Sequence, residues 1–400
     1  MTVEVAPFGV TCNLSCTYCY QHPMRDAGNF GTNGVNFDRV IEELEKVGED
    51  FTIFGGEALL TPKEDLRKLF SYGLERYGKN DIQTNGVLID DEHIDMFHEY
   101  NVSVGFSFDG PGKLNDLRWS GSLEKTREDT ERTLSNLERV LDERIPASAI
   151  LTLHKVNVGT RERLDEFISF LYWLDEIGID GVRFHDLEVD TEITARNHVL
   201  SDEEKINVFL ELAEVGKNID SLYVDIFDDI QRLLQGNETS NSCTWGACDP
   251  LNTQAVHEID GEGNLGNCGM VNKEGIGWIK SDDQGFERYI ALAQTPQEYG
   301  GCKDCRFFSM CRGQCPGSSF DGDWRNKSSG CSLWKSLFNY FEKELINENP
   351  GFVPVSLRKD RQEIEARMVE GWKNNQERSI DEIIREIEEE DTVSINVPIK

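Results

Sequence analysis

Eleven cysteines, gathered in two separate parts of a 400-residue chain, constrain the fold more than any other feature. Three of them lie within Cys12–Cys19, and the other eight lie within Cys243–Cys331. The N-terminus has neither the basic region nor the apolar run of a signal peptide, and no stretch approaches the roughly 20 apolar residues of a membrane span. We therefore expect a cytoplasmic protein with no membrane partner. In that reducing compartment, so many cysteines, odd in number, indicate metal or redox chemistry rather than disulfides.

The charge of the chain excludes one class of partner. There are 74 acidic and 41 basic residues, which gives a net charge of −33. Such a field repels phosphate backbones, so we expect no nucleic acid partner. Two explanations of the acidity stay open, a salt-rich cytoplasm or a cationic substrate. The acids are spread along the chain rather than clustered, which favours the first.

Short β-branched runs alternate with amphipathic segments through the first two-thirds of the chain. We expect strands at Val3–Val10, Phe51–Phe54, Asp81–Thr84, Val102–Phe108, Ala147–Leu153 and Gly181–Leu187. We expect helices between them, at Asp38–Lys46, Lys63–Tyr77, Asp90–Tyr100, Leu123–Leu141 and Arg161–Ile177. This alternation predicts an α/β protein with a parallel sheet. Six such units would form a partial (β/α)6 TIM-like barrel, with its active site at the C-terminal ends of the strands.

The pattern changes near Gly236. From there to residue 330 the chain is rich in glycine, cysteine, asparagine and aspartate, and so loop-rich a segment needs bound metal to hold it. A helix is expected at Leu333–Ile346, and charged helices follow, including Ile380–Asp391. The length also favours more than one domain. We expect the barrel at residues 1–235, a loop-rich, cysteine-rich iron–sulfur domain at 236–346, and a charged helical tail at 347–400 that is a solvated appendage.

The first cysteine group directly follows the first expected strand. Cys12, Cys16 and Cys19 are spaced so that three thiolates of one loop can bind three corners of a [4Fe–4S] cluster. The fourth iron would then be open to a substrate or cofactor. The alternative is a zinc site, with His22 as the fourth ligand.

This CxxxCxxC spacing, with Tyr18 before the last cysteine, resembles the radical S-adenosylmethionine (SAM) superfamily. Further matches follow the later strands, in Gln83-Thr84-Asn85-Gly86 and Ser107-Phe108-Asp109-Gly110. The resemblance assigns SAM binding to Tyr18, Gly55, Gly56, Glu57, Ser107, Arg118 and, as a secondary candidate, Asn157.

Each of these assignments has a physical reason. The two glycines let the backbone approach SAM closely, and the Glu57 carboxylate would pair with its ammonium group. The resemblance implies that Ser107 contacts the ribose and that Arg118 reaches the carboxylate. Family members usually have proline where this chain has Ala58, which is a departure.

The second cysteine group resembles the SPASM domain, whose pattern it fits from Cys248 onward. The resemblance implies two auxiliary [4Fe–4S] clusters, three clusters in all. The nearer one would be held by Cys243, Cys248, Cys268 and Cys315. The outer one would be held by Cys302, Cys305, Cys311 and Cys331. A pair of Cys₄ zinc sites would stabilise such a domain equally well, and is the alternative.

The resemblance implies an enzyme that generates a 5′-deoxyadenosyl radical, with the cofactor carrying the difficult step. Hydrogen abstraction from a peptide or protein would then give an oxidative modification, with a thioether or carbon–carbon crosslink favoured. The alternatives are formylglycine formation, as in anaerobic sulfatase-maturing enzymes, and oxidation of a small molecule. In the sulfatase-maturing enzymes an aspartate, the proposed general base, follows the cysteine equivalent to Cys268. Here Gly269 follows it, so Asp260 or Glu274 would have to approach instead.

The expected partners are a precursor peptide or protein substrate and a low-potential electron donor such as ferredoxin or flavodoxin. No separate leader-binding domain is expected before the barrel, so recognition would fall to the SPASM surface, the tail or another protein. An electron carrier of the ferredoxin type would explain the cysteines but not the barrel or the SAM motifs. His154 and His185 end two strands and are given no catalytic role. Trp324 and Trp334 are expected in the core.

Overall fold

The computed structural model describes residues 2–28, 34–187, 197–219, 221–253, 256–271, 281 and 284–395, with side chains up to residue 390. The chain forms two compact units. Unit 1 comprises Met1–Asp225 and Val256–Lys280, and unit 2 comprises Ile226–Ala255 and Ser281–Lys400. None of the helices in the described residues has the length and apolar character needed to cross a membrane.

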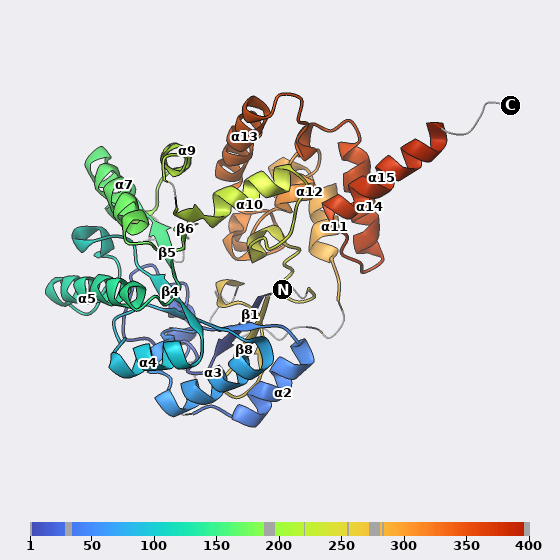
Figure 1. The fold of residues 1–400 in the computed structure, drawn as a ribbon. Helices are drawn as coiled ribbons and strands as arrows, with labels where there is room; N and C mark the ends of the chain where they lie inside the picture. The colour runs from blue at the N-terminus through green and yellow to red at the C-terminus, as the bar shows by residue number, and fades with distance from the viewer. Residues whose placement is uncertain are drawn as a thin grey trace. The chain divides into compact units, whose positions relative to one another are not determined.

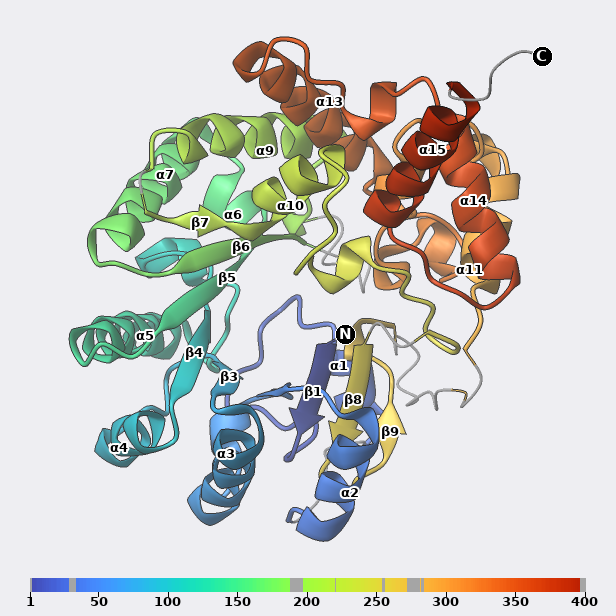
Figure 2. The same cartoon turned by 45° about the vertical axis from the view of Figure 1, so that its right-hand side comes forward.

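Unit 1 is built on one sheet in which eight parallel strands are followed by a single antiparallel one (Figures 1 and 2). The strand order is β7-β6-β5-β4-β3-β2-β1-β8-β9. The strands are β1 (Thr2–Ala6), β2 (Phe51–Ile53), β3 (Asn80–Thr84), β4 (Val102–Ser107), β5 (Ala147–Leu153), β6 (Gly181–Asp186), β7 (Tyr223–Val224), β8 (Val256–Asp260) and β9 (Leu265–Gly266). The curved, open sheet confirms the expected partial barrel of the α/β class.

The helices of unit 1 follow the strands in turn. They are α1 (His22–Asp26), α2 (Phe37–Val47), α3 (Lys63–Tyr77), α4 (Asp91–Glu99), α5 (Leu123–Asp142), α6 (Lys155–Val158), α7 (Arg161–Glu176) and α9 (Asp202–Gly216). Local signals fix their starts, since Ser122 caps α5 and Thr160 caps α7 through side-chain oxygens. Each long helix buries one apolar face, as α3 does with Leu66, Leu69 and Phe70.

Alternation along the strands divides the sheet into two faces. In β4 every second residue is buried, and the residues between them are only half-buried. The buried set packs beneath the helices, so the half-buried set lies on the opposite, concave face. The register places Glu258 beside Glu4 and Thr152 beside His185 on that face.

The six expected strands all exist, but three further strands were missed. Residues 7–10, expected as part of the first strand, turn away after Ala6. β7 has only two residues, too few for a periodic signal. β8 lies in the segment expected to be loops, and it joins unit 1 by pairing with β1. The two units therefore do not follow the segment boundaries expected at residues 235 and 346.

Unit 2 is helical and rich in loops, as its composition predicts. Its helices are α10 (Asp225–Leu234, which begins at the boundary), α11 (Glu287–Gln294), α12 (Phe308–Cys311), α13 (Cys331–Glu348), α14 (Arg361–Lys373) and α15 (Ile380–Ile395). Its largest buried side chains include Trp245, Tyr289 and Trp372. Trp324 and Trp334, expected in the core, are only half-buried.

The tail is part of the core of unit 2, so the expected solvated appendage is wrong. Met368 and Trp372 of α14 are each 1% exposed, and Ile383 of α15 is fully buried. The Trp372 ring lies 5.4 Å from that of Tyr289 and 5.9 Å from that of Phe308. The many acids of these helices occupy only their outer faces, which hid the apolar stripe from an argument based on charge.

Candidate functional site

The cysteine loop, residues 12–19, follows β1 and is held from both sides. On one side the N–H groups of Ser15 and Thr17 donate to the carbonyl oxygens of Trp119 and Leu117, at 2.7 and 2.9 Å. On the other side the amide of Asn85, at the end of β3, donates to Asn13 Oδ1 at 2.7 Å. Residues from the ends of several strands thus fix the loop that carries Cys12, Cys16 and Cys19.

Gly55 and Gly56 allow the backbone after β2 to lie directly against the start of this loop. The N–H of Gly56 donates to Gly9 O at 2.8 Å. A Cβ atom on Gly56 would meet Thr11 O at 2.3 Å, and one on Gly55 would meet Gly9 O at 2.5 Å. Gly55 also has a φ of 125°, which other residues rarely adopt. The structure therefore gives both glycines a role in placing the cysteine loop.

Glu57, the next residue, is 2% exposed and already has several hydrogen-bond partners. Its carboxylate accepts from the Thr84 hydroxyl at 2.5 Å and from the N–H groups of Leu59 and Asn85. Burial raises the pKa of Glu57, and these hydrogen bonds oppose that rise. Among the described residues, Oε2 accepts a hydrogen bond from the Asn85 N–H alone, so it has capacity for an ammonium donor.

Asp109, just beyond β4, connects three of the expected SAM-site residues. Its carboxylate is fully buried and accepts a 2.5 Å hydrogen bond from the Tyr18 hydroxyl. Arg118 Nη2 lies 3.2 Å from Oδ1, and His154 Nε2 lies 3.2 Å from Oδ2. The Asn157 amide donates to the main-chain oxygen of Asp109 at 3.0 Å. Tyr18, Arg118 and Asn157 therefore belong to one buried network.

The network keeps Asp109 ionised. Burial acts to raise the pKa of Asp109, but the Arg118 charge and the hydrogen bonds from His154 and Tyr18 outweigh it and lower the pKa to about 2. Burial acts to lower the pKa of Arg118, yet the Asp109 carboxylate raises it above its usual range. His154 Nδ1 accepts from the Asn157 N–H, which assigns the Nε2 proton to Asp109.

Ser107 is oriented by a neighbouring strand. Gln83 of β3 donates its amide to Ser107 Oγ at 2.7 Å. This arrangement requires Gly105, because a Cβ there would meet Gln83 Oε1 at 2.2 Å. Both Ser107 and Gln83 lie at half-buried positions of the concave face.

The donor set fits the cofactors that the motifs imply. Burial raises the pKa of Cys12 to about 11 and that of Cys16 to about 12, so these thiols would have to lose protons to bind metal. The charge of Arg118 opposes the rise at Cys16. The Nε atom of Arg118 is buried and has no hydrogen-bond partner among the described residues. A guanidinium with a spare buried donor fits a carboxylate ligand such as that of SAM.

Two carboxylates on the concave face were missed by the sequence analysis. Burial raises the pKa of Glu4 to about 7, although Arg183 acts to lower it. Burial and the neighbouring charges of Glu4 and Asp260 raise the pKa of Glu258 to about 8, opposed by a hydrogen bond from the Gly269 N–H. The alternation within β1 and β8 would have placed them, had β8 been recognised.

The sequence offers Asp260 and Glu274 as possible substitutes for the missing general base. Asp260 accepts hydrogen bonds from the N–H groups of Glu262 and Asn264 in the turn after β8, so its carboxylate is occupied there. Glu274 lies outside the described residues. Glu258, by contrast, accepts a hydrogen bond from the N–H of Gly269, the residue that follows Cys268.

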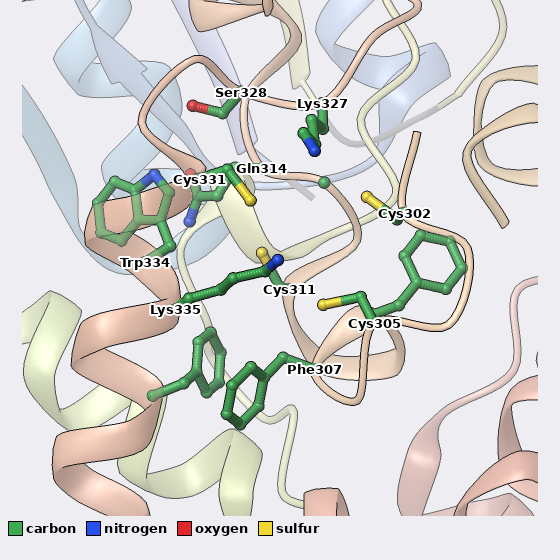
Figure 3. Close-up of a pocket in the computed structure, with 13 residues that line it drawn as sticks. Cys302, Cys305, Phe307, Cys311, Gln314, Lys327, Ser328, Cys331, Trp334 and Lys335 are labelled. Atoms are coloured by element: carbon green, nitrogen blue, oxygen red, sulfur yellow. The ribbon is translucent and has the colours of Figure 1, made fainter. Parts of the chain in front are cut away.

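Unit 2 contains a pocket, partly open to solvent, that is lined by four of the cysteines (Figure 3). These are Cys302, Cys305, Cys311 and Cys331, the set expected to hold the outer cluster. Burial raises the pKa of Cys302 to about 12 and that of Cys311 further. The four thiols surround a cavity. Among the described residues, no three histidine, cysteine, aspartate or glutamate side chains lie close enough together to hold a single metal ion. A single zinc needs all its thiolates at about 2.3 Å, whereas a cluster spreads them over four irons.

The set expected for the nearer cluster is divided between the units. Cys243, Cys248 and Cys315 belong to unit 2, and Cys268 follows β9 in unit 1. Their joint role as ligands therefore stays a prediction.

Comparisons with known proteins agree with these features. Residues 6–168 match the model of the radical SAM superfamily. The chain is 24% identical to a cysteine-type anaerobic sulfatase-maturating enzyme of Clostridium perfringens (strain 13), over 87% of this chain and 98% of that protein. It is also 24% identical to a serine-type enzyme of Bacteroides thetaiotaomicron, over 89% of this chain and 94% of that protein.

The fold is shared with a solved structure. Native anSMEcpe with bound AdoMet and Cp18Cys peptide matches 87% of this chain and 99% of its own, with a TM-score of 0.62 at 20% identity. The cofactors are accordingly SAM and [4Fe–4S] clusters, auxiliary clusters included. The chain is thus an enzyme that contains a radical SAM domain at residues 6–168 and is similar to sulfatase-maturating enzymes along most of its length.

Proposed function

We propose that the chain oxidises a cysteine or serine side chain of a peptide or protein to formylglycine. The observation that carries this proposal is the extent of the similarity: the chain spans 98% of a cysteine-type and 94% of a serine-type maturating enzyme. The crosslinking reaction favoured by the sequence analysis has no comparable support.

The reaction must account for all atoms and electrons. When bound, SAM with its cluster supplies a radical that removes one hydrogen atom from the substrate Cβ. Oxidation of a serine –CH₂OH group to –CHO releases a second hydrogen as a proton and an electron. A cysteine loses the same proton and electron to give a thioaldehyde, which water converts to the aldehyde and hydrogen sulfide. The chain must therefore supply a proton acceptor and a route for one electron, which a one-electron carrier protein finally receives.

The residues of the chain match these needs. The network of Asp109, Arg118 and Tyr18 would hold the amino-acid part of SAM beside the cysteine loop. Glu258 is proposed as the proton acceptor, because its carboxylate lies against the Gly269 N–H, where relatives have an aspartate. Glu258 must itself be ionised to take up this proton, and because burial raises its pKa to about 8, the proposal predicts that the reaction is fastest at alkaline pH.

An anaerobic assay with matched peptides tests the proposal. Reconstituted protein is incubated with SAM, a reductant and peptides that differ only in a central cysteine, serine or alanine. We expect an aldehyde in the cysteine or serine peptide, detected by mass spectrometry and by a hydrazide probe, and none in the alanine peptide. Products that lose hydrogen but do not react with the probe would refute formylglycine formation.

Crosslinking is kept as a second candidate because of one residue. Gly269 replaces the aspartate that follows this cysteine in the sulfatase-maturing enzymes. A crosslinked peptide would resist the hydrazide probe and would give linked fragments in tandem mass spectrometry, so the same assay separates the two reactions.

A further inference from the structure

The cysteine pocket of unit 2 is lined by cations but by no acid. Besides the four cysteines, Lys327 and Lys335 line it, and none of its lining residues is aspartate or glutamate. Both lysine side chains extend toward the space between the thiols (Figure 3). The lining therefore carries two positive charges, although the chain as a whole has 74 acidic and 41 basic residues.

One glutamine binds both ammonium groups. Lys327 Nζ donates to the main-chain oxygen of Gln297 at 2.6 Å, and Lys335 Nζ donates to Oε1 of the same residue. Among the described residues neither ammonium forms an ion pair with a carboxylate. By contrast, the half-buried Lys63 and Arg367 each pair with two or more acids.

A third cation lies beneath this region. Arg288 is 1% exposed and acts on Cys302, whose rise in pKa its charge opposes. Its hydrogen bonds in the described structure go to Tyr289 and to three carbonyl oxygens, of Gln314, Trp324 and Asn326. The buried carboxylate of Asp249 lies close enough for the charge of Arg288 to act on its pKa, but none of the hydrogen bonds that Arg288 makes in the described part of the chain goes to a carboxylate. A further anion nearby would stabilise this buried cation. A cluster bound by four thiolates is such an anion.

We propose that Lys327 and Lys335 raise the reduction potential of the cluster held by Cys302, Cys305, Cys311 and Cys331, so that it accepts the electron released by substrate oxidation. Reduction adds one negative charge to the cluster. Two ammonium groups in the same pocket stabilise that charge, more strongly in a partly buried site than in water. The electron then leaves to a one-electron carrier protein.

The charges of Lys327 and Lys335 act on the thiols of the pocket. Burial raises the pKa of Cys331, and the charges of Lys335 and Lys327 oppose the rise. Lys327 also opposes the rise at Cys302. The two ammonium groups therefore act on thiols contributed by separate segments of the pocket. The role of the cluster as electron acceptor rests on the proposed oxidation of the substrate. The reduction potential of the cluster is measured without substrate.

The test is a redox titration followed by electron paramagnetic resonance on full-length, reconstituted protein. Cys12, Cys16 and Cys19 are replaced by alanine in every sample, so that only auxiliary clusters contribute signals. Lys327→Met and Lys335→Met are compared with Lys343→Met, which removes the same charge from an exposed position further along α13. Lys335→Arg keeps the charge.

Each methionine variant in the pocket is expected to make reduction of one auxiliary cluster about tenfold less favourable, which is about 59 mV for one electron. The midpoint potential of the other auxiliary cluster should not change in these variants. In Lys343→Met and Lys335→Arg, the midpoint potentials of both auxiliary clusters should not change. If a methionine variant loses iron, Lys327→Gln or Lys335→Gln is used in its place, because glutamine keeps a hydrogen-bond donor for Gln297. The same shift in midpoint potential is expected. Unchanged midpoints with full iron, or an equal shift in Lys343→Met, would overturn the proposal. Failure of the peptide assay would leave this result standing.

Discussion

The hydroxyl group of Tyr18 donates a 2.5 Å hydrogen bond to Oδ2 of Asp109, and this bond joins the cysteine loop to the end of β4. Asp109 is fully buried and also pairs with Arg118. Arg118, expected to bind the SAM carboxylate, and Tyr18, the aromatic residue of the cysteine motif, thus both bind the carboxylate of Asp109. The position of the cysteine loop thus depends on a charge to which the sequence analysis gave no role.

Asp109→Asn removes that charge while keeping the size of the side chain. Arg118 is then buried without a counter-charge, so the free energy of unfolding should fall by about 3–5 kcal/mol, and SAM should bind more weakly. Thermal denaturation and anaerobic SAM titration measure the two effects. Asp116→Asn is the control, because Asp116 pairs with the half-exposed Arg127 and should cost at most about 1 kcal/mol. Equal losses in both variants would show that the buried pair has no special role.

Gly56→Ala should displace the cysteine loop. The new Cβ would meet the main-chain oxygens of Thr11 and Val10 at 2.3 and 2.4 Å, and backbone cannot move aside as a side chain can. We expect loss of one cluster, about four iron atoms per chain, with the auxiliary clusters kept. Iron and sulfide analysis of reconstituted protein measures this. Gly216→Ala, where the Cβ has open space, should retain all its iron, and full loading of Gly56→Ala would contradict this account.

The pair of Glu4 and Glu258 predicts how stability depends on pH. The pKa of Glu258 is raised from 4.5 to about 8, so between these values the folded chain holds a proton that the unfolded chain has lost. The free energy of unfolding therefore falls as pH rises through this window. Because the Glu258 side chain is only half-buried by surface area, Glu258→Gln should remove about 1–2 kcal/mol of that fall rather than the full effect of the raised pKa.

The melting temperature of Glu258→Gln, followed from about pH 5 to 8, checks this expectation. The exposed Glu262→Gln is the matched control and should follow the unmodified chain. An equal fall in Glu258→Gln and in the unmodified chain would mean that Glu258 is already ionised in the folded chain and would contradict this account.

Trp372→Ala tests whether the tail belongs to the core of unit 2. Trp372 is 1% exposed and packs on Tyr289 and Phe308, so its truncation should cost about 3–5 kcal/mol and loosen α12, which ends at Cys311. Denaturation together with retention of auxiliary iron measures both effects. Tyr299→Ala, at a position 72% exposed, should be close to neutral. A neutral Trp372→Ala would restore the view of the tail as an appendage.

The sequence allowed the barrel and the SAM motifs to be predicted because both depend on local signals. Strand–helix alternation located six strands, and the cysteine spacing located the loop after β1. Long-range pairing was not predictable in the same way: β8 became a strand through its register with β1, far away in the chain. The role of Asp109 was missed because its partners come from three loops that only the fold brings together.

The most direct measurement of the central claim is deuterium transfer from the substrate to 5′-deoxyadenosine. Peptides with a central serine or cysteine deuterated at Cβ are turned over anaerobically with SAM, and the 5′-deoxyadenosine is analysed by mass spectrometry. The account predicts one deuterium in each molecule formed during turnover, in step with the aldehyde product. Product formed without deuterium transfer would contradict removal of a hydrogen atom from the side-chain Cβ, and with it the proposed reaction.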